Sequence, residues 1–265
     1  MRPVKNKWKV IMKQLLSYNV ANLQGKGSRE YQEDSFGFVN ALDVTEIRIN
    51  GLFAAVADGM GGMQGGREAS ILVMKTLMAD FENMDRKAHL GLQLAQSILH
   101  AGDLVYQMLR GAGGSTIVAG IFYNEMLYFA SVGDSTIWLV RDGEVIHLNE
   151  PHNMKLQRYH ESFSAGIMDP FPGRRDLQSY ALTQHVGMRE EAKVDMNYRP
   201  LRLENKDVLI FCSDGVGEVL TEEEVLYCLD SPLASDACAR MESLIRQKDL
   251  PGQDNYTALV IKCSY

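Results

Sequence analysis

The chain has 265 residues, of which 46% are hydrophobic and 23% charged, a composition that is ordinary for a globular protein with a sizeable core. Its formal net charge of -7 argues against general binding to nucleic acid. No apolar run is long enough to cross a bilayer, and the first residues lack the long apolar region of a secretory signal, so we expect a cytoplasmic protein. The four cysteines show no paired spacing and are expected to be reduced.

The basic residues are concentrated at the start of the chain. Residues 1–29 carry Lys and Arg side chains that sum to +7 and no acidic side chain, so the net charge of -7 leaves -14 on the remainder. We interpret residues 1–16 as a basic, solvated N-terminal segment, with contact to an anionic membrane or an acidic partner as the less favoured alternative. The chain shows no repeat and no linker-like tract, so we predict that residues 17–265 form one domain and expect a monomer.

In the first part of the chain, apolar runs predict strands and apolar stripes at helical spacing predict helices. A strand at 52–57 precedes helices at 66–81 and 89–110, which we expect to cover one sheet face as an antiparallel pair. Tight turns are indicated between Phe122 and Met126 and between Arg141 and Glu144. Three strands in succession joined by such turns imply an antiparallel meander. The strands that follow the helices are predicted at 116–122, 126–132, 136–141 and 144–148.

The second part of the chain begins with a region that shows no clear pattern. Residues 149–207 contain several prolines and form a long irregular insertion, which in a compact domain is often a functional loop. After it we predict a strand at 208–213, a helix from Thr221 to Leu229 with Thr221 as its N-cap, a helix at 234–247 and a strand at 257–263. Strands and helices in blocks indicate an α+β layered fold.

Aspartates stand at the ends of the apolar runs. Asp58, Asp134 and Asp214 each come at the end of a predicted strand, while Asp254 and Asp34 each precede an apolar run. An acidic residue at a single strand end is usually part of a turn. Five such sites in one chain are harder to explain in that way.

If these strand ends meet at one rim, the carboxylates predict bound metal. Two carboxylates about 5 Å apart repel by about 3 kcal/mol at an effective dielectric of 20. Ligands that are all oxygen favour Mg²⁺ or Mn²⁺ over Zn²⁺, and the six histidines show no zinc-binding spacing. Two such ions suit displacement at phosphorus, because they generate hydroxide from water near neutral pH.

A phosphate-binding cation is then expected near the carboxylates. Arg29 lies five residues before Asp34, and a planar guanidinium binds phosphate oxygens in a bidentate way. We therefore predict that Arg29 is catalytic and binds the substrate. Simple solvation of its side chain is the alternative.

Taken together, these motifs resemble the protein phosphatase 2C family, the metal-dependent serine/threonine protein phosphatases, in its bacterial form. The resemblance extends from about Tyr18 to Ile261, and its motifs occur in family order. They are Arg29-Glu-Tyr-Gln-Glu-Asp34, Val56-Ala-Asp-Gly-Met-Gly-Gly62, Gly114-Ser-Thr116, Val132-Gly-Asp-Ser135, Cys212-Ser-Asp-Gly215 and Asp254-Asn255.

The resemblance implies a four-layer α-β-β-α sandwich in which helix pairs flank two antiparallel sheets. It implies hydrolysis of phosphoserine and phosphothreonine on proteins, with two Mn²⁺ or Mg²⁺ ions and a third, weaker one. The substrates would be phosphoproteins made by a Ser/Thr protein kinase. The implied roles are Asp58 bridging two ions, the Gly59 carbonyl on one of them, Asp214 and Asp254 on the other, Asp134 with Asp214 on the third, Glu33 and Asp34 acting through metal-bound waters, Arg29 on the phosphate, and a flap within 149–207.

The chain departs from the family pattern at several places. Met60 stands where the animal enzymes have a histidine thought to act as general acid, so a metal-bound water is the expected proton donor. Gln32-Glu33 is closer to the eukaryotic form of the first motif. Thr136 and Pro151-His152-Asn153 replace the usual residues after Gly-Asp-Ser and in the Asp-His-Ser motif, which affects the flap contacts and substrate choice.

Two other functions were weighed against this one. The first is binding of nucleotide phosphates by Gly59–Gly66, which is glycine-rich and precedes a predicted helix. Its spacing fits neither the G-x-G-x-x-G pattern nor the G-x-x-x-x-G-K-S/T pattern. A non-catalytic phosphatase-like domain that binds a kinase or a phosphoprotein is the second alternative. The presence of Asp58, Asp214 and Asp254 argues against it.

Overall fold

The protein is described by a computed structural model that covers residues 15–60, 65–167 and 181–265. Nearly all of the basic segment predicted at 1–16 lies outside these residues, as does part of the insertion. None of the helices in the described ranges is long and apolar enough to span a membrane.

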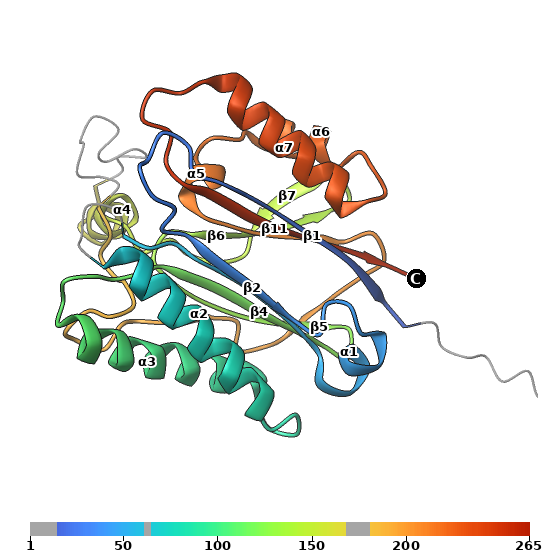
Figure 1. Ribbon diagram of the computed structural model, residues 1–265, viewed down its shortest axis with the longest axis horizontal. Helices are drawn as coiled ribbons and strands as arrows, with labels where there is room; N and C mark the ends of the chain where they lie inside the picture. Colours follow the sequence, from blue (N-terminus) through green and yellow to red (C-terminus); the bar gives the residue numbers. More distant parts are fainter. Residues whose placement is uncertain (1–14, 61–64, 168–180) are drawn as a thin grey trace, which may run out of the picture.

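Two antiparallel sheets form the centre of the molecule (Figure 1). The strands of the first sheet lie in the order β1 (Ser17–Gly25), β11 (Tyr256–Ser264), β10 (Val208–Cys212), β6 (Thr136–Arg141) and β7 (Glu144–His147). The second sheet has the order β2 (Ser35–Val39), β3 (Leu52–Ala57), β4 (Ile117–Tyr123), β5 (Met126–Val132) and β8 (Asp195–Met196), with β9 (Leu201–Arg202) also paired to β5.

A helix pair covers the outer face of each sheet, which confirms the predicted four-layer sandwich (Figure 1). Helices α2 (Gly66–Asn83) and α3 (Leu90–Leu109) pack on the second sheet. Helices α6 (Glu222–Leu229) and α7 (Ala234–Lys248) pack on the first. Thr221 is the N-cap of α6, as predicted, and it also forms a capping box with Glu224. The remaining helices are α1 (Val44–Asn50), α4 (Met154–Ser164) and the short α5 (Asp214–Gly217).

Strand β3 shows why the central strands read as continuous apolar runs. All six of its residues are buried. Leu52, Ala54 and Val56 pack between the two sheets, whereas the alternate residues Phe53, Ala55 and Ala57 pack under α2 and α3. A strand covered on both faces has no polar side, because successive side chains point to opposite faces.

The predicted meander is wrong at one connection. β4 and β5 pair, as do β6 and β7, and both turns have the positive φ angles of tight hairpins. However, β5 and β6 belong to different sheets. The chain crosses from one layer to the other after Val132, at Gly133, whose φ of 102° few other residues could adopt.

Candidate metal centre

The register of the second sheet places three of the predicted ligands at one rim. Ser35 pairs with Ala57, so Asp34 and Asp58 lie side by side just beyond the ends of β2 and β3. Ile117 pairs with Val132, so the turn that carries Asp134 lies at the same end.

The first sheet brings the other two acidic residues to this rim. Cys212 at the end of β10 pairs with both Thr136 and Ala258. Asp214 comes just after β10, and Asp254 comes just before the neighbouring strand β11. Both residues therefore lie at the same end of the sheet. Helices α4 and α5 lie at this same end of the sandwich (Figure 1). Five carboxylates from remote parts of the sequence thus meet at one edge of the molecule.

Asp58 is at the electrostatic centre of this group. Burial, followed by the negative charges of Asp34, Asp214, Asp134 and Asp254, raises the pKa of its carboxyl group well above the usual value. Such a shift means that the ionised form of Asp58 is disfavoured unless positive charge is nearby. These four neighbours of Asp58 are the acidic residues that the sequence singled out.

Asp34 is buried and only partly satisfied by hydrogen bonds. Its Oδ2 accepts from Ser213 Oγ at 3.0 Å and from Thr257 Oγ1 at 2.7 Å, while its Oδ1 has no hydrogen-bond partner. Burial raises the pKa of Asp34 to about 6 despite these donors. The two hydroxyl donors were not predicted from the sequence, because they belong to strand ends far from Asp34 along the chain.

Asp134 and Asp214 show the same conflict between burial and charge. Burial, and then the nearby Asp214 carboxylate, raises the pKa of Asp134 to about 7. Burial and the charge of Asp254 raise the pKa of Asp214, whose Oδ1 also has no hydrogen-bond partner. Oxygen atoms that are buried, crowded and unpartnered in this way suit a hard divalent cation.

The backbone around Gly59 is packed too tightly for a side chain. A Cβ atom at this position would overlap the carbonyl oxygens of Glu33 and Gly66. The Gly59 amide donates to the Glu33 carbonyl at 3.2 Å, which joins the first and second motifs. The carboxylate of Glu33 lies near Gly66, where α2 begins, and burial raises its pKa.

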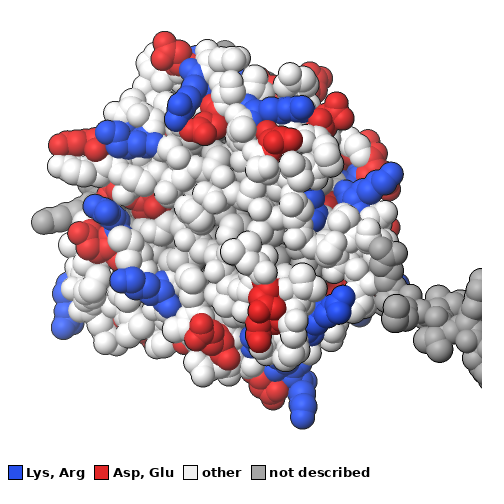
Figure 2. All heavy atoms as spheres, turned by 45° about the vertical axis from the view of Figure 1, so that its right-hand side comes forward, with Lys and Arg blue, Asp and Glu red and all other residues white. Residues whose placement is uncertain are grey.

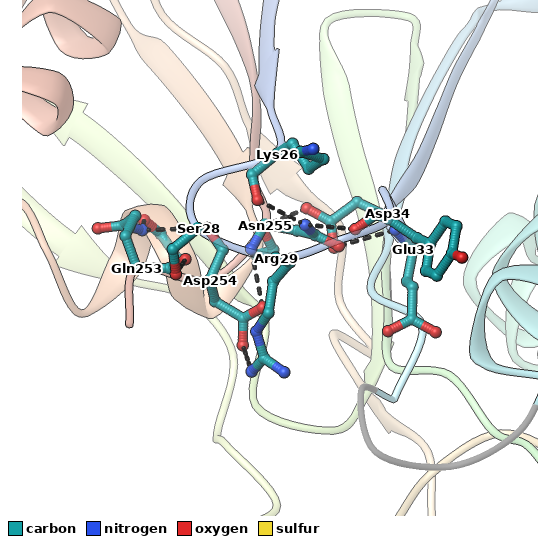
Figure 3. Close-up of polar contacts among 11 residues, drawn as sticks. Lys26, Ser28, Arg29, Glu33, Asp34, Gln253, Asp254 and Asn255 are labelled. Carbon is teal, nitrogen blue, oxygen red and sulfur yellow. Dashed lines mark hydrogen bonds and ion pairs between the residues drawn. The ribbon is translucent and has the colours of Figure 1, made fainter. Parts of the chain in front are cut away.

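Asn255 ties the loop of the first motif to the last one (Figure 3). Its Nδ2 donates to the carbonyls of Lys26 and Tyr31 at 2.9 and 3.0 Å, and its Oδ1 accepts from the Glu33 amide at 2.7 Å. The sequence showed Asn255 only as the neighbour of Asp254 and gave it no role. In the structure it holds the segment that contains Arg29, Glu33 and Asp34 against β11.

Arg29 lies at the rim but contacts an acidic residue rather than solvent alone. Its Nη2 is 2.5 Å from Asp254 Oδ2, and the two side chains point toward one another (Figure 3). Within the described residues, no three His, Cys, Asp or Glu side chains surround one point closely enough to hold an ion as they stand. The structure therefore brings the predicted ligands to one rim without assigning a coordination shell.

The base of the insertion is attached to the turn that carries Asp134. The His152 amide donates to the Gly133 carbonyl at 2.8 Å, and the Gly133 amide donates to His152 Nδ1 at 3.1 Å. Asn153 then caps α4 by accepting from the Leu156 amide at 3.0 Å. The residues that replace the usual Asp-His-Ser motif thus start α4 beside the acidic rim.

Comparison with known proteins agrees with this architecture. The sequence model of the family described as Protein phosphatase 2C matches residues 32–253. Protein phosphatase PhpP of Streptococcus pneumoniae is 30% identical over 220 residues, which are 78% of this chain and 83% of that protein. The serine/threonine phosphatase stp of Listeria welshimeri is 25% identical over 245 residues, which are 88% of this chain and 91% of that protein.

Solved structures share the fold. The serine/threonine phosphatase of S. agalactiae superposes with a TM-score of 0.77 at 24% identity, over 92% of this chain and 99% of that one. A PstP catalytic domain in complex with two manganese ions superposes with a TM-score of 0.72 at 23% identity, over 94% of this chain and 100% of that one.

The layered fold and the acidic rim define a metal-dependent phosphatase. Since the family match spans well over half of the sequence, the chain belongs to the protein phosphatase 2C family, in its bacterial form. It is a metal-dependent protein serine/threonine phosphatase, as the resemblance in the sequence implied.

Proposed function

We propose that the enzyme hydrolyses phosphoserine and phosphothreonine on proteins at the acidic rim between the two sheets. The observation that carries this proposal is the set of buried carboxylates with raised pKa, two of which have an oxygen without a hydrogen-bond partner. Structural acids are normally paired or hydrogen-bonded when they are buried. Uncompensated acids at one edge indicate a site built for cations.

For this site we adopt the metal ligands that the resemblance in the sequence implies. The ions are Mn²⁺ or Mg²⁺, because every proposed donor is an oxygen. When bound, they supply the positive charge that makes a water molecule nucleophilic near neutral pH. The proposed ligands are Asp58, the Gly59 carbonyl, Asp134, Asp214 and Asp254, with Asp34 and Glu33 orienting water around them.

Arg29 is proposed to bind the phosphate group of the substrate. Its ion pair with Asp254 places the guanidinium at the acidic rim and uses one of its five N–H donors. The remaining donors suit the bidentate binding of phosphate oxygens. Both partners are partly exposed, at 44% and 38%, so the pair is screened by water and can rearrange when substrate enters.

The substrates are proposed to be phosphoproteins made by a serine/threonine kinase, bound by the enzyme as a monomer. The insertion 149–207 provides a flap beside the rim, since α4 has no buried residue and is not part of the core. On the face shown in Figure 2, the described Lys, Arg, Asp and Glu side chains are interspersed rather than gathered into a basic area. The formal net charge of -7 agrees with a protein substrate and not with nucleic acid.

Hydrolysis of a phosphoserine peptide in Mn²⁺ tests the proposal. The Asp58→Asn variant should lose about 10²–10³-fold or more in activity, since it removes a charge at the centre of the site. Asp103→Asn is the matched control, because Asp103 is exposed on α3. Activity in EDTA, or full activity of Asp58→Asn, would refute the mechanism. A wild-type protein that binds phosphopeptide without hydrolysing it would instead favour the non-catalytic, regulatory alternative.

A further inference from the structure

A short ladder extends from the metal-binding loop toward the insertion. Gly59 forms an isolated bridge with Ser115, and Ser115 forms another with Val186. The Thr116 amide donates to the Asp58 carbonyl at 2.8 Å. Ser115 and Val186 exchange two backbone hydrogen bonds of 3.1 and 2.8 Å. Three remote segments are thus joined edge to edge beside the acidic rim.

The alternation of side chains along this ladder places His185 on the same face as Asp58. Ser115 and Val186 are both buried, and Val186 packs in the core under α3. Paired residues in an antiparallel ladder share a face, and the next residues along each strand point to the opposite face. The row next to Ser115 and Val186 therefore consists of Asp58, Thr116 and His185, all directed away from that core.

The space above Gly114 confirms this orientation. A Cβ atom at Gly114 would lie 2.5 Å from His185 Nδ1 and 2.9 Å from Met60 Sδ. The imidazole and the thioether therefore meet over a residue that has no side chain. His185 is partly exposed, so the ring reaches solvent at the rim.

The ring of His185 has one nitrogen with a backbone partner. Nδ1 lies 3.3 Å from the Val186 carbonyl oxygen. When Nδ1 donates its proton to that carbonyl, Nε2 remains for another partner. The neighbouring Met60 has a thioether, which holds no proton to transfer.

We propose that His185 is the general acid of the reaction. This proposal rests on the proposed phosphatase function. As the P–O bond of the substrate breaks, its electron pair stays on the serine or threonine oxygen, and the imidazolium of His185 transfers its Nε2 proton to that oxygen. The products are the free hydroxyl group, a phosphate that carries the attacking oxygen, and a neutral imidazole that regains its proton from water. An alkoxide is a poor leaving group, and a positioned acid contributes about 10²–10⁴-fold to such a step.

Dependence on the leaving group tests the proposal. We suggest measuring kcat/KM in Mn²⁺ for a phosphoserine peptide, phenyl phosphate and 4-nitrophenyl phosphate, whose leaving groups are increasingly acidic. His185→Ala and His185→Asn should both lose about 10²-fold on the peptide, less on phenyl phosphate and least on 4-nitrophenyl phosphate. His100→Ala is the control, because His100 is exposed on α3 and pairs with Asp80.

The outcomes separate this role from others. Equal losses on all three substrates, or recovery in His185→Asn, would show that His185 only supports the structure, and a metal-bound water would then be the donor. Unchanged peptide hydrolysis in both variants would also overturn the proposal. Calorimetric titration with Mn²⁺ should give the same affinity for the variants and the wild type. The wild-type rates test the phosphatase function separately, since a wild type inactive on every substrate would contradict both proposals.

Discussion

The two rims of the sandwich both contain buried aspartates, but only one rim satisfies them. Asp207 precedes β10 at the end opposite the candidate metal centre, where it accepts from Arg141 Nε at 2.8 Å, from Arg141 Nη2 at 2.6 Å and from the Glu204 amide at 2.7 Å. Asp34, at the acidic rim, is also buried and has an oxygen without a hydrogen-bond partner. A paired buried acid supports the fold, whereas an unpaired one indicates a binding site.

The connections at the two rims differ in the same way. At the rim of Asp207, two-residue turns at Asn124-Glu125 and Asp142-Gly143 close the hairpins with positive φ angles. At the acidic rim, the loop between β1 and β2 is instead held to the start of β11 by the side chain of Asn255, which belongs to a remote segment. One end of the strands thus serves folding and the other serves chemistry. Three predictions test that division, the largest effect first.

Removing the satisfied acid should cost the most stability. Asp207→Ala leaves Arg141 without its bidentate partner, so we expect the free energy of unfolding to fall by about 3–5 kcal/mol. Asp134→Ala at the acidic rim should stay within about 1 kcal/mol of wild type, because it removes a charge that burial disfavours. Urea denaturation in EDTA measures both. The division between the rims fails if Asp134→Ala is as destabilising as Asp207→Ala.

The unsatisfied acids should make the metal-free protein more stable as pH falls. The folded pKa values of Asp34 and Asp134, about 6 and about 7, lie above the unfolded value of about 3.9. Between these values the folded chain binds more protons, so the stability conferred by protonation is lost as pH rises through about 6 and 7. At about 1.4 kcal/mol per pKa unit, the two groups together predict a decrease of about 4 kcal/mol between about pH 5 and pH 8.

Denaturation curves in EDTA at several pH values would show this trend. The double variant Asp34→Asn, Asp134→Asn should reduce the slope, since neither amide titrates, and the raised pKa values of Asp58 and Asp214 account for the slope that remains. Adding Mn²⁺ should reverse it, because metal ligands must be deprotonated. A wild-type curve that rises with pH in EDTA would contradict the assignment of unsatisfied charge to this rim.

The smallest effect is expected at a hairpin turn of the opposite rim. Gly143 has a φ of 82° and open space around it, so Gly143→Ala should cost about 1 kcal/mol through backbone strain alone. Gly102→Ala in α3 has room for its Cβ and ordinary helical φ, so it should stabilise by about 0.5–1 kcal/mol. Thermal unfolding distinguishes the two variants. Phosphatase activity should stay at the wild-type level in Gly143→Ala, and a selective loss of activity would link this turn to the site.

Strands buried on both faces were the easiest elements to predict. The run 52–57 was predicted with the bounds that β3 has, because every one of its residues is apolar and covered. β1 was not predicted, since Leu23 is its single buried residue and the rest of the strand mixes polar and apolar side chains. α4 was not predicted either, and none of its residues is buried.

The sequence by itself determined local features of this protein: which fully buried apolar runs are strands, where Asp142-Gly143 turns the chain, and which acids stand at strand ends. Those features depend on side-chain periodicity and backbone preference over a few residues. Only the tertiary structure decided that β1 pairs with β11, that Arg29 meets Asp254, and that His185 faces the same side as Asp58. Such contacts follow from strand order and register, which are fixed by the burial of side chains from remote segments.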